Sequence, residues 1–193
     1  MGRTDRSGRI LFSDLPYGTY TIKETKASKG YQTDPAVYTA EIRTNGETVS
    51  FNSYEPDIKG GVEIQKLDED MRLLVNAEGE ASEKGVPYAE GDRSLEGAVF
   101  PIYNKSAHAV LDPTGKIAAV NEAVMTITTD QNGYAATGEK DLPSGTYLIR
   151  ETKASEGYKQ NGQWEKTFEI REDGKRISYL TETEACPEPG IRG

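Results

Sequence analysis

Residues 142–158 read LPSGTYLIRETKASEGY, and residues 15–31 read LPYGTYTIKETKASKGY. The two stretches are identical at most positions, which indicates an internal repeat. In each copy a Pro-x-Gly sequence predicts a tight turn, and the residues that follow alternate with a period of two, as in a β-strand. The chain therefore contains two copies of one turn-and-strand unit.

The strand in the second copy carries an acidic residue on its apolar face. By parity Glu151 lies on the same side as Tyr147 and Ile149, and Glu24 occupies the matching position in the first copy. A carboxylate among core residues is costly unless it is protonated or paired. Glu151 is therefore the strongest functional candidate, and the alternative is a solvated or salt-bridged strand carboxylate.

The composition narrows the class of protein. Hydrophobic residues make up 35% of the 193 and charged residues 28%, which fits small β domains with much surface. A net charge of −9 argues against a nucleic-acid partner. With Cys186 as its one cysteine the chain cannot form an internal disulfide. It shows no apolar run that could cross a membrane and no export signal, so we expect either a cytosolic protein or a piece of a longer one.

The repeat and the turn signals predict the domain organisation. Residues 61–184 contain roughly seven short strands separated by turns, which favours an antiparallel β-sandwich. Residues 1–56 match only the later strands of that unit and are predicted to be a C-terminal half-domain. Residues 57–60 are the expected linker and residues 185–193 a tail. Within the half-domain, 10–12, 37–43 and 47–52 are expected strands.

Period-two patterning also predicts the core of the complete domain. The expected core residues are Val62, Ile64, Val99, Ile102, Ile127, Tyr147, Ile149, Phe168 and Ile170.

Four motifs in a fixed order resemble a known family. They are Lys66-Leu67-Asp68, Gly97 to Tyr103 (GAVFPIY), Asp130 to Tyr134 (DQNGY) and Leu142 to Glu151. This order resembles the collagen-adhesin B-type (Cna B-type, prealbumin-like) repeat of Gram-positive surface adhesins and pilins. The resemblance implies an inverse immunoglobulin-like sandwich in an extracellular, cell wall-attached protein. The implied function is that of a structural stalk whose partners are neighbouring repeats.

Many domains of this family contain an intramolecular amide (isopeptide) bond. A lysine on the first strand joins an Asn or Asp on the last strand, promoted by a glutamate between them. The resemblance assigns Lys66 as nucleophile, Glu151 and Glu24 as the promoting glutamates, and Asn52 as acceptor in the first copy. In the second copy the aligned acceptor position is Leu180, which offers no electrophilic carbon, so we expect no Lys66 bond there. The simpler interpretations are a strand-end lysine that reaches water and a turn-side amide at Asn52.

Two other functions remain open at this stage. Residues 68–94 or the loops within 104–123 could contact a host matrix protein or glycan, which would make the segment an adhesin. An enzyme is not expected, because the chain shows no nucleophile–His–carboxylate set, no metal-ligand cluster and no phosphate-binding loop. No cofactor or metal is predicted.

Overall fold

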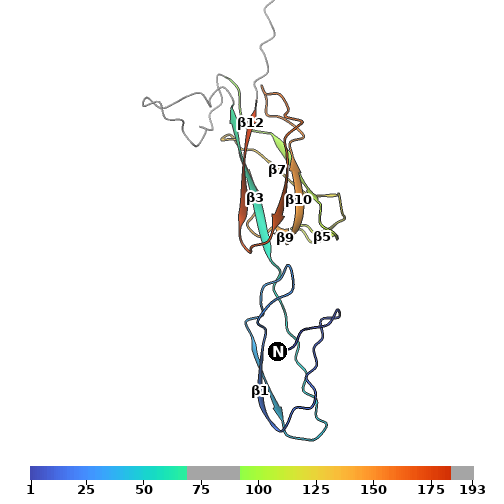
Figure 1. The fold of residues 1–193 in the computed structure, drawn as a ribbon. Helices are drawn as coiled ribbons and strands as arrows, with labels where there is room; N and C mark the ends of the chain where they lie inside the picture. Colours follow the sequence, from blue (N-terminus) through green and yellow to red (C-terminus); the bar gives the residue numbers. More distant parts are fainter. Residues whose placement is uncertain (69–91, 184–193) are drawn as a thin grey trace, which may run out of the picture. The chain divides into compact units, whose positions relative to one another are not determined.

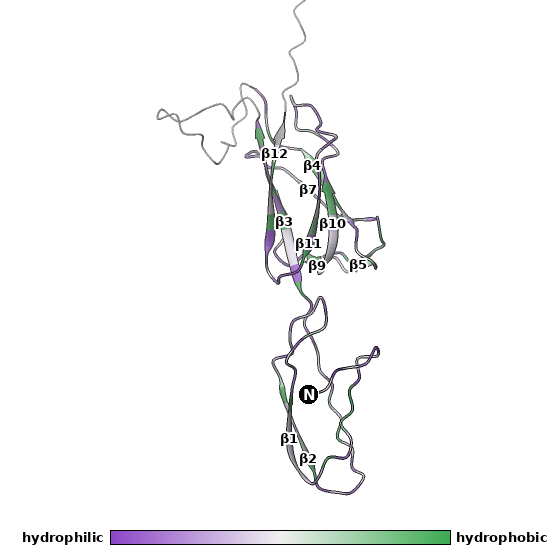
Figure 2. Cartoon of the chain, in the orientation of Figure 1, coloured by the Kyte–Doolittle hydropathy of each residue, from purple (hydrophilic) through white to green (hydrophobic). Residues whose placement is uncertain are grey.

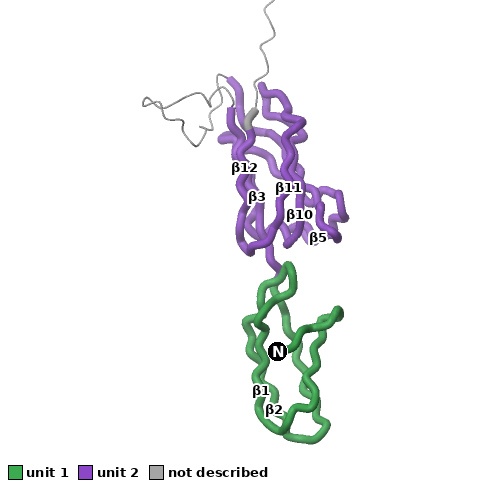
Figure 3. Tube along the Cα trace, viewed as in Figure 1, with its two compact units in different colours: residues 1–56 green, residues 57–193 purple. Residues whose placement is uncertain are grey.

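The computed structural model describes residues 1–68 and 92–183, which fall into two compact units (Figures 1 and 3). Unit 1 comprises residues 1–56, and unit 2 comprises residues 57–193.

Unit 2 is a sandwich of two sheets, and the all-β prediction is confirmed. The first sheet has the order β11-β10-β4-β7, with β11 at Glu165–Ile170, β10 at Gly145–Arg150, β4 at Val99–Asn104 and β7 at Ala123–Thr128. The second has the order β12-β3-β8, with β12 at Arg176–Thr183, β3 at Lys59–Asp68 and β8 at Tyr134–Ala136. Strand β9 (Leu142–Pro143) also pairs with β3, and β5 (Val110–Leu111) forms a small hairpin with β6 (Ile117–Ala118).

The first and last strands of unit 2 run side by side in the same direction (Figure 1). Their parallel register begins at Gly61↔Arg176 and ends at Asp68↔Thr183, whereas the other strand pairs are antiparallel. Strand β3 starts at Lys59, inside the predicted linker. A Cβ atom added at Gly60 would lie 2.7 Å from the Lys175 carbonyl oxygen, so this close approach requires glycine.

The core lies between the two sheets, and all but one of the predicted core residues are buried. Val99 is the exception: it is half-buried, and its neighbour Phe100 is fully buried. Residues 99–103 are apolar at both parities, so alternation alone could not assign their inward face. Aromatic contacts join the two sheets, with Phe168 packed between Tyr147 at 5.6 Å and Tyr179 at 6.4 Å.

Unit 1 contains one strand pair, β1 (Gly18–Lys23) with β2 (Val37–Ile42), among its described residues. Its register matches that of β10 with β11: Gly18 pairs with Ile42 as Gly145 pairs with Ile170. The predicted strands at 10–12 and 47–52 were wrong, because these residues adopt no strand. In unit 2 the matching segments pair with β3, and the described part of unit 1 has no equivalent of β3. Hydrophobic stretches are nevertheless present in unit 1 (Figure 2).

A buried lysine–glutamate pair as the candidate functional site

Lys66 and Glu151 meet in the interior of unit 2. Lys66 lies on β3, and Glu151 directly follows β10, so the two residues come from opposite sheets. Both side chains are fully buried, and the Lys66 Nζ donates a hydrogen bond to Glu151 Oε1. Strand parity predicted that Glu151 would be buried beside Lys66, and the structure places the two residues in that way.

Several neighbours fix the position of the Glu151 carboxylate. Its second oxygen, Oε2, accepts a hydrogen bond of 2.9 Å from the backbone N–H of Asn161. The Lys66 Nζ also lies 5.9 Å from the centre of the Phe100 ring, within the range of a cation–π contact. The pair is therefore held by a backbone donor on one side and an aromatic ring on the other.

Burial lowers the pKa of Lys66, and the hydrogen bond and negative charge of Glu151 offset only part of that effect. Burial disfavours the charged ammonium because few polar groups replace its water shell. The amine consequently becomes neutral at a lower pH than a lysine in water. A neutral, buried amine beside a carboxyl group is chemically capable of nucleophilic attack on a suitably placed carbonyl.

Thr181 occupies the position on the last strand that faces this amine. It is the register partner of Lys66, it is buried, and its hydroxyl has no hydrogen-bond partner among the described residues. Leu180, the predicted counterpart, instead pairs with Gln65 and is 59% exposed. The alignment was therefore wrong by one residue. A threonine side chain also lacks a carbonyl group, so the reason for expecting no Lys66 bond is unchanged.

Unit 1 repeats part of this arrangement around Glu24. The Glu24 Oε2 accepts a hydrogen bond of 2.7 Å from the backbone N–H of Asp34, as Glu151 does from Asn161. That hydrogen bond lowers the pKa of Glu24, but burial and the neighbouring Glu55 carboxylate together raise it overall.

The structure places Asn52 at an exposed position, where its backbone carbonyl accepts a hydrogen bond of 3.0 Å from the Tyr38 hydroxyl. In the repeat, Asn52 corresponds to Leu180 and Ser53 corresponds to Thr181. The Ser53 hydroxyl donates a 2.5 Å hydrogen bond to Asp34.

A second buried polar cluster was not identified from the sequence. Asp68 lies two residues beyond Lys66 on the same face of β3 and accepts a 2.6 Å hydrogen bond from the Tyr158 hydroxyl. Arg93 Nη1 lies 3.7 Å from the same carboxylate oxygen. The sequence could have indicated this cluster, because Lys66 and Asp68 are two residues apart and therefore lie on the same face of the strand. This cluster attaches the end of the repeated stretch to the first strand.

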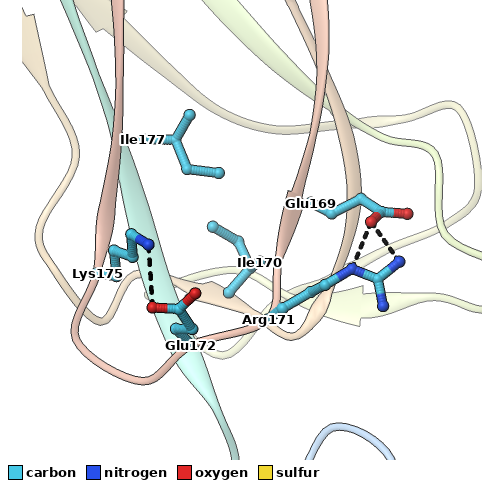
Figure 4. Close-up of a pocket in the computed structure, with 6 residues that line it drawn as sticks. All are labelled: Glu169, Ile170, Arg171, Glu172, Lys175 and Ile177. Atoms are coloured by element: carbon cyan, nitrogen blue, oxygen red, sulfur yellow. Dashed lines mark hydrogen bonds and ion pairs between the residues drawn. The ribbon is translucent and has the colours of Figure 1, made fainter.

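Unit 2 has a small surface pocket beside the turn between β11 and β12. Its volume is about 190 Å³. In it Lys175 pairs with Glu172, and Arg171 pairs with Glu169 (Figure 4). The charged side chains of this pocket are therefore paired with one another and are not directed at a common ligand position. In the described ranges, no group of three or more His, Cys, Asp or Glu residues could hold a metal ion. No helix within those ranges is long and apolar enough to cross a membrane.

Comparisons with known proteins identify the fold family. The family description "SpaA: Prealbumin-like fold domain" matches residues 2–55 and 87–184. The Bacillus anthracis TIE protein is 30% identical with a TM-score of 0.67, and the match covers 94% of this chain and 28% of that protein. The chain thus spans less than a third of that relative. A search of curated proteins found no match.

Two structures of pilus proteins show lower similarity. The pilus 2b backbone protein of group B streptococcus is 18% identical with a TM-score of 0.46, and the match covers 84% of this chain and 54% of that protein. The C-terminal fragment of the pilus adhesin SpaC from Lactobacillus rhamnosus GG is 18% identical with a TM-score of 0.47, covering 92% and 80%. Because the family description accounts for well over half of the residues, in both units, the chain belongs to the SpaA prealbumin-like fold domain family.

Proposed function

We propose that the chain is a load-bearing structural segment of an extracellular, cell wall-attached adhesin or pilin of a Gram-positive bacterium. Its immediate partners are neighbouring repeats of the same surface protein. Membership of the prealbumin-like family and the similarity to the Bacillus anthracis TIE protein support this proposal.

The parallel pairing of β3 with β12 is the observation that carries the proposal. The chain enters unit 2 at the start of β3 and leaves at the end of β12, so a pull on the two ends acts along the strands in opposite directions. Such a pull loads the eight register pairs from Gly61↔Arg176 to Thr183↔Asp68 together, in shear. Peeling the strands apart from one end would instead break their hydrogen bonds in succession.

The Lys66–Glu151 pair adds a connection between the two sheets. By the resemblance, Glu151 and Glu24 occupy the places of the isopeptide-promoting glutamates, and Lys66 occupies the place of the nucleophile in unit 2. With Thr181 beside Lys66, this site acts as a non-covalent ionic clamp. By the resemblance Asn52 is the acceptor candidate of unit 1, although Ser53 is the residue that corresponds to Thr181.

Single-molecule force spectroscopy tests the proposal with two pulling directions on the full chain. After Cys186→Ser, attachment cysteines at Asp57 and Leu180 load β3 and β12 in shear. Attachment at Asp57 and Lys175, which lie at the same end of these strands, pulls them apart sideways and is the matched control. We expect a clearly higher unfolding force in the shear direction. Equal forces in the two directions would contradict a load-bearing role for this strand pair.

A second candidate function is adhesion to a host matrix protein or glycan. The β5–β6 hairpin favours it, because Leu111, Ile117 and Val120 are exposed there and form apolar surface within the predicted 104–123 region. Most of the other predicted contact region, 68–94, lies outside the described residues. Binding to immobilised matrix proteins and a glycan array, lost on Leu111→Asp and Ile117→Asp but retained on Tyr134→Asp, would support this alternative. Unchanged binding in the hairpin variants would exclude it.

A further inference from the structure

The start of β3 passes close between two backbone segments of unit 2. A Cβ atom added at Gly60 would lie 2.7 Å from the Lys175 carbonyl oxygen, and one added at Gly61 would lie 2.4 Å from the Gly138 carbonyl oxygen. These carbonyls lie next to β12 and β8, which border β3 on its two sides. A side chain at either glycine would force the backbone segments apart, so the entering strand is enclosed from both sides.

The turn between β11 and β12, residues 171–175, holds the residue that comes before the two glycines. The Lys59 N–H donates a 3.0 Å hydrogen bond to Asp173 Oδ1, and the Lys59 carbonyl accepts a 2.7 Å hydrogen bond from the Gly174 N–H. Two residues later the Gly61 N–H donates a 2.9 Å hydrogen bond to the Lys175 carbonyl. The turn therefore binds both backbone polar groups of Lys59 and continues along the strand.

Asp173 also connects this turn to the segment between β8 and β9. Its second oxygen, Oδ2, accepts a 2.7 Å hydrogen bond from the Lys140 Nζ, and its side chain is 23% exposed. Hydrogen bonds to an ionised group are stronger than those between neutral groups. The Asp173 carboxylate therefore joins three segments: the start of β3, the β11–β12 turn and the β8–β9 connection.

These contacts come before the register pairs of β3 with β12, which begin at Gly61↔Arg176. A pull applied at Asp57 reaches Lys59 before it reaches any of those pairs. The load on a strand under shear is greatest where the force enters. Under the proposed load-bearing function, on which this inference rests, the bonds of Asp173 therefore carry the highest load.

We propose that the β11–β12 turn is a mechanical lock on the entry of β3, and that Asp173 sets the force at which unit 2 begins to yield. While the lock is closed, the start of β3 cannot slide past the turn, so the force spreads over the register pairs behind it. When the Asp173 bonds break, Lys59 and Gly60 are released, and the load falls first on the Gly61 end of the register.

Force spectroscopy on the full chain, with the shear attachment points described above, tests this lock. Asp173→Ala removes the acceptor of the Lys59 N–H and the partner of Lys140, so we expect a clearly lower unfolding force. Glu172→Ala is the matched control, because it removes a neighbouring carboxylate whose ion pair with Lys175 is exposed (Figure 4). Exposed ion pairs contribute little, so this variant should unfold at the wild-type force.

A more conservative change separates the two bonds of the carboxylate. Asp173→Asn retains an oxygen that can accept from Lys59 but has no charge for Lys140. We expect its unfolding force to lie between those of Asp173→Ala and the wild type.

Hydrogen exchange of the full chain at rest gives a second readout. The N–H groups of Gly61 and Gly174 keep their acceptors in Asp173→Ala, so they exchange faster only if the lock opens as a unit. We expect both to exchange at least about tenfold faster in Asp173→Ala than in Glu172→Ala.

The outcomes distinguish the lock from the load-bearing function. The lock is overturned if Asp173→Ala and Glu172→Ala unfold at the same force, or if Gly61 and Gly174 exchange equally in both variants; neither result affects a high shear force of the wild type. Equal wild-type forces in the two pulling directions would instead contradict the load-bearing function, and the exchange rates would then decide whether the lock forms in the folded state.

Discussion

Lys66 and Glu151 stabilise unit 2 only as a pair, because each would otherwise be an isolated charge in the core. Both side chains are fully buried. Removing one member of a buried ion pair is strongly destabilising, whereas replacing both with apolar residues of similar size is often neutral.

Lys66→Met is therefore expected to lower the free energy of unfolding of unit 2 by about 3–5 kcal/mol, measured by denaturant titration at neutral pH. The double variant Lys66→Met/Glu151→Leu should recover most of that loss. If the double variant is as unstable as the single one, the cost arises from packing rather than from an unpaired carboxylate.

Thr181 holds the position at which an acceptor would have to lie, so one substitution should supply the missing reactant. In Thr181→Asn, the Lys66 Nζ is expected to attack the new carboxamide carbon, forming an amide and releasing ammonia. Glu151 would take up the proton from the amine and pass it to the departing amide nitrogen, which leaves as ammonia. Intact mass should then fall short of the sequence mass by one ammonia.

Two control variants show whether this chemistry uses the site. The mass deficit should disappear in Lys66→Ala/Thr181→Asn and should be absent from Thr181→Val. A Thr181→Asn chain that folds but retains its full sequence mass would show that Thr181 does not face the amine in reactive geometry.

Parity made the Lys66–Glu151 contact predictable, because both residues share the inward phase of their apolar neighbours. The same rule could have identified Thr181, since Ile177, Tyr179 and Thr181 are in phase. Leu180 was assigned instead because it aligns with Asn52 of the first copy, and the structure leaves it exposed. The alternation within the strand was the more reliable signal.

At the scale of strands, local sequence predicted the elements that complete their pairing within one repeat. The β1–β2 pair formed as expected because its two strands are close in sequence and satisfy each other. Residues 47–52 carry an equally good pattern but form no strand, because their backbone partner would be a strand like β3. A strand needs a partner for its backbone groups, which propensity alone cannot supply.

Asp34 connects the start of β2 to the last segment of unit 1. Its carboxylate accepts hydrogen bonds from the Ser53 hydroxyl, the Ala36 N–H and the Tyr38 hydroxyl, which lower its pKa from 3.8 to about 2. A carboxylate with a lowered pKa in the folded state stabilises above the unfolded value of 3.8, and this contribution is lost as pH falls toward 2.

The structure of unit 1 is thus expected to loosen between about pH 4 and pH 2, followed through the amide signals of Tyr38 and Ser53. Asp34→Asn should remove this transition while leaving the acid response of unit 2 unchanged. Identical transitions in the wild type and in Asp34→Asn would rule out Asp34 as the group responsible.

At the scale of the whole molecule, the two units differ in how much apolar surface they bury. The large cluster of buried apolar residues lies entirely in unit 2. Among the described residues of unit 1, Ala40 is the single buried hydrophobic residue. Regions with few buried apolar contacts unfold locally at a low cost in free energy.

Limited proteolysis of the 193-residue chain is therefore expected to cut within residues 1–56 well before it cuts the strands of unit 2, as followed by mass spectrometry. Survival of an intact 1–56 segment under conditions that digest unit 2 would show that the half-domain is the more stable unit.

The resemblance of the motifs predicted the sandwich and the family, but it could not predict the parallel pairing of β3 with β12. That contact joins residues more than a hundred positions apart in sequence, and its register depends on the packing of the whole sandwich. The proposed load-bearing function depends on this pairing, and among the described residues the register partner of Lys66 is Thr181, which offers no carbonyl acceptor.

The gain in contour length when unit 2 is pulled between Asp57 and Leu180 tests both points at once. With no covalent link at Lys66, the account predicts one unfolding event at high force that releases about 400 Å of chain. A covalent bond between Lys66 and the last strand would close the residues between them into a loop that the pull cannot extend. A gain in contour length limited to the few residues outside that loop would therefore show such a bond. Gradual extension at low force would show that β3 and β12 bear no load.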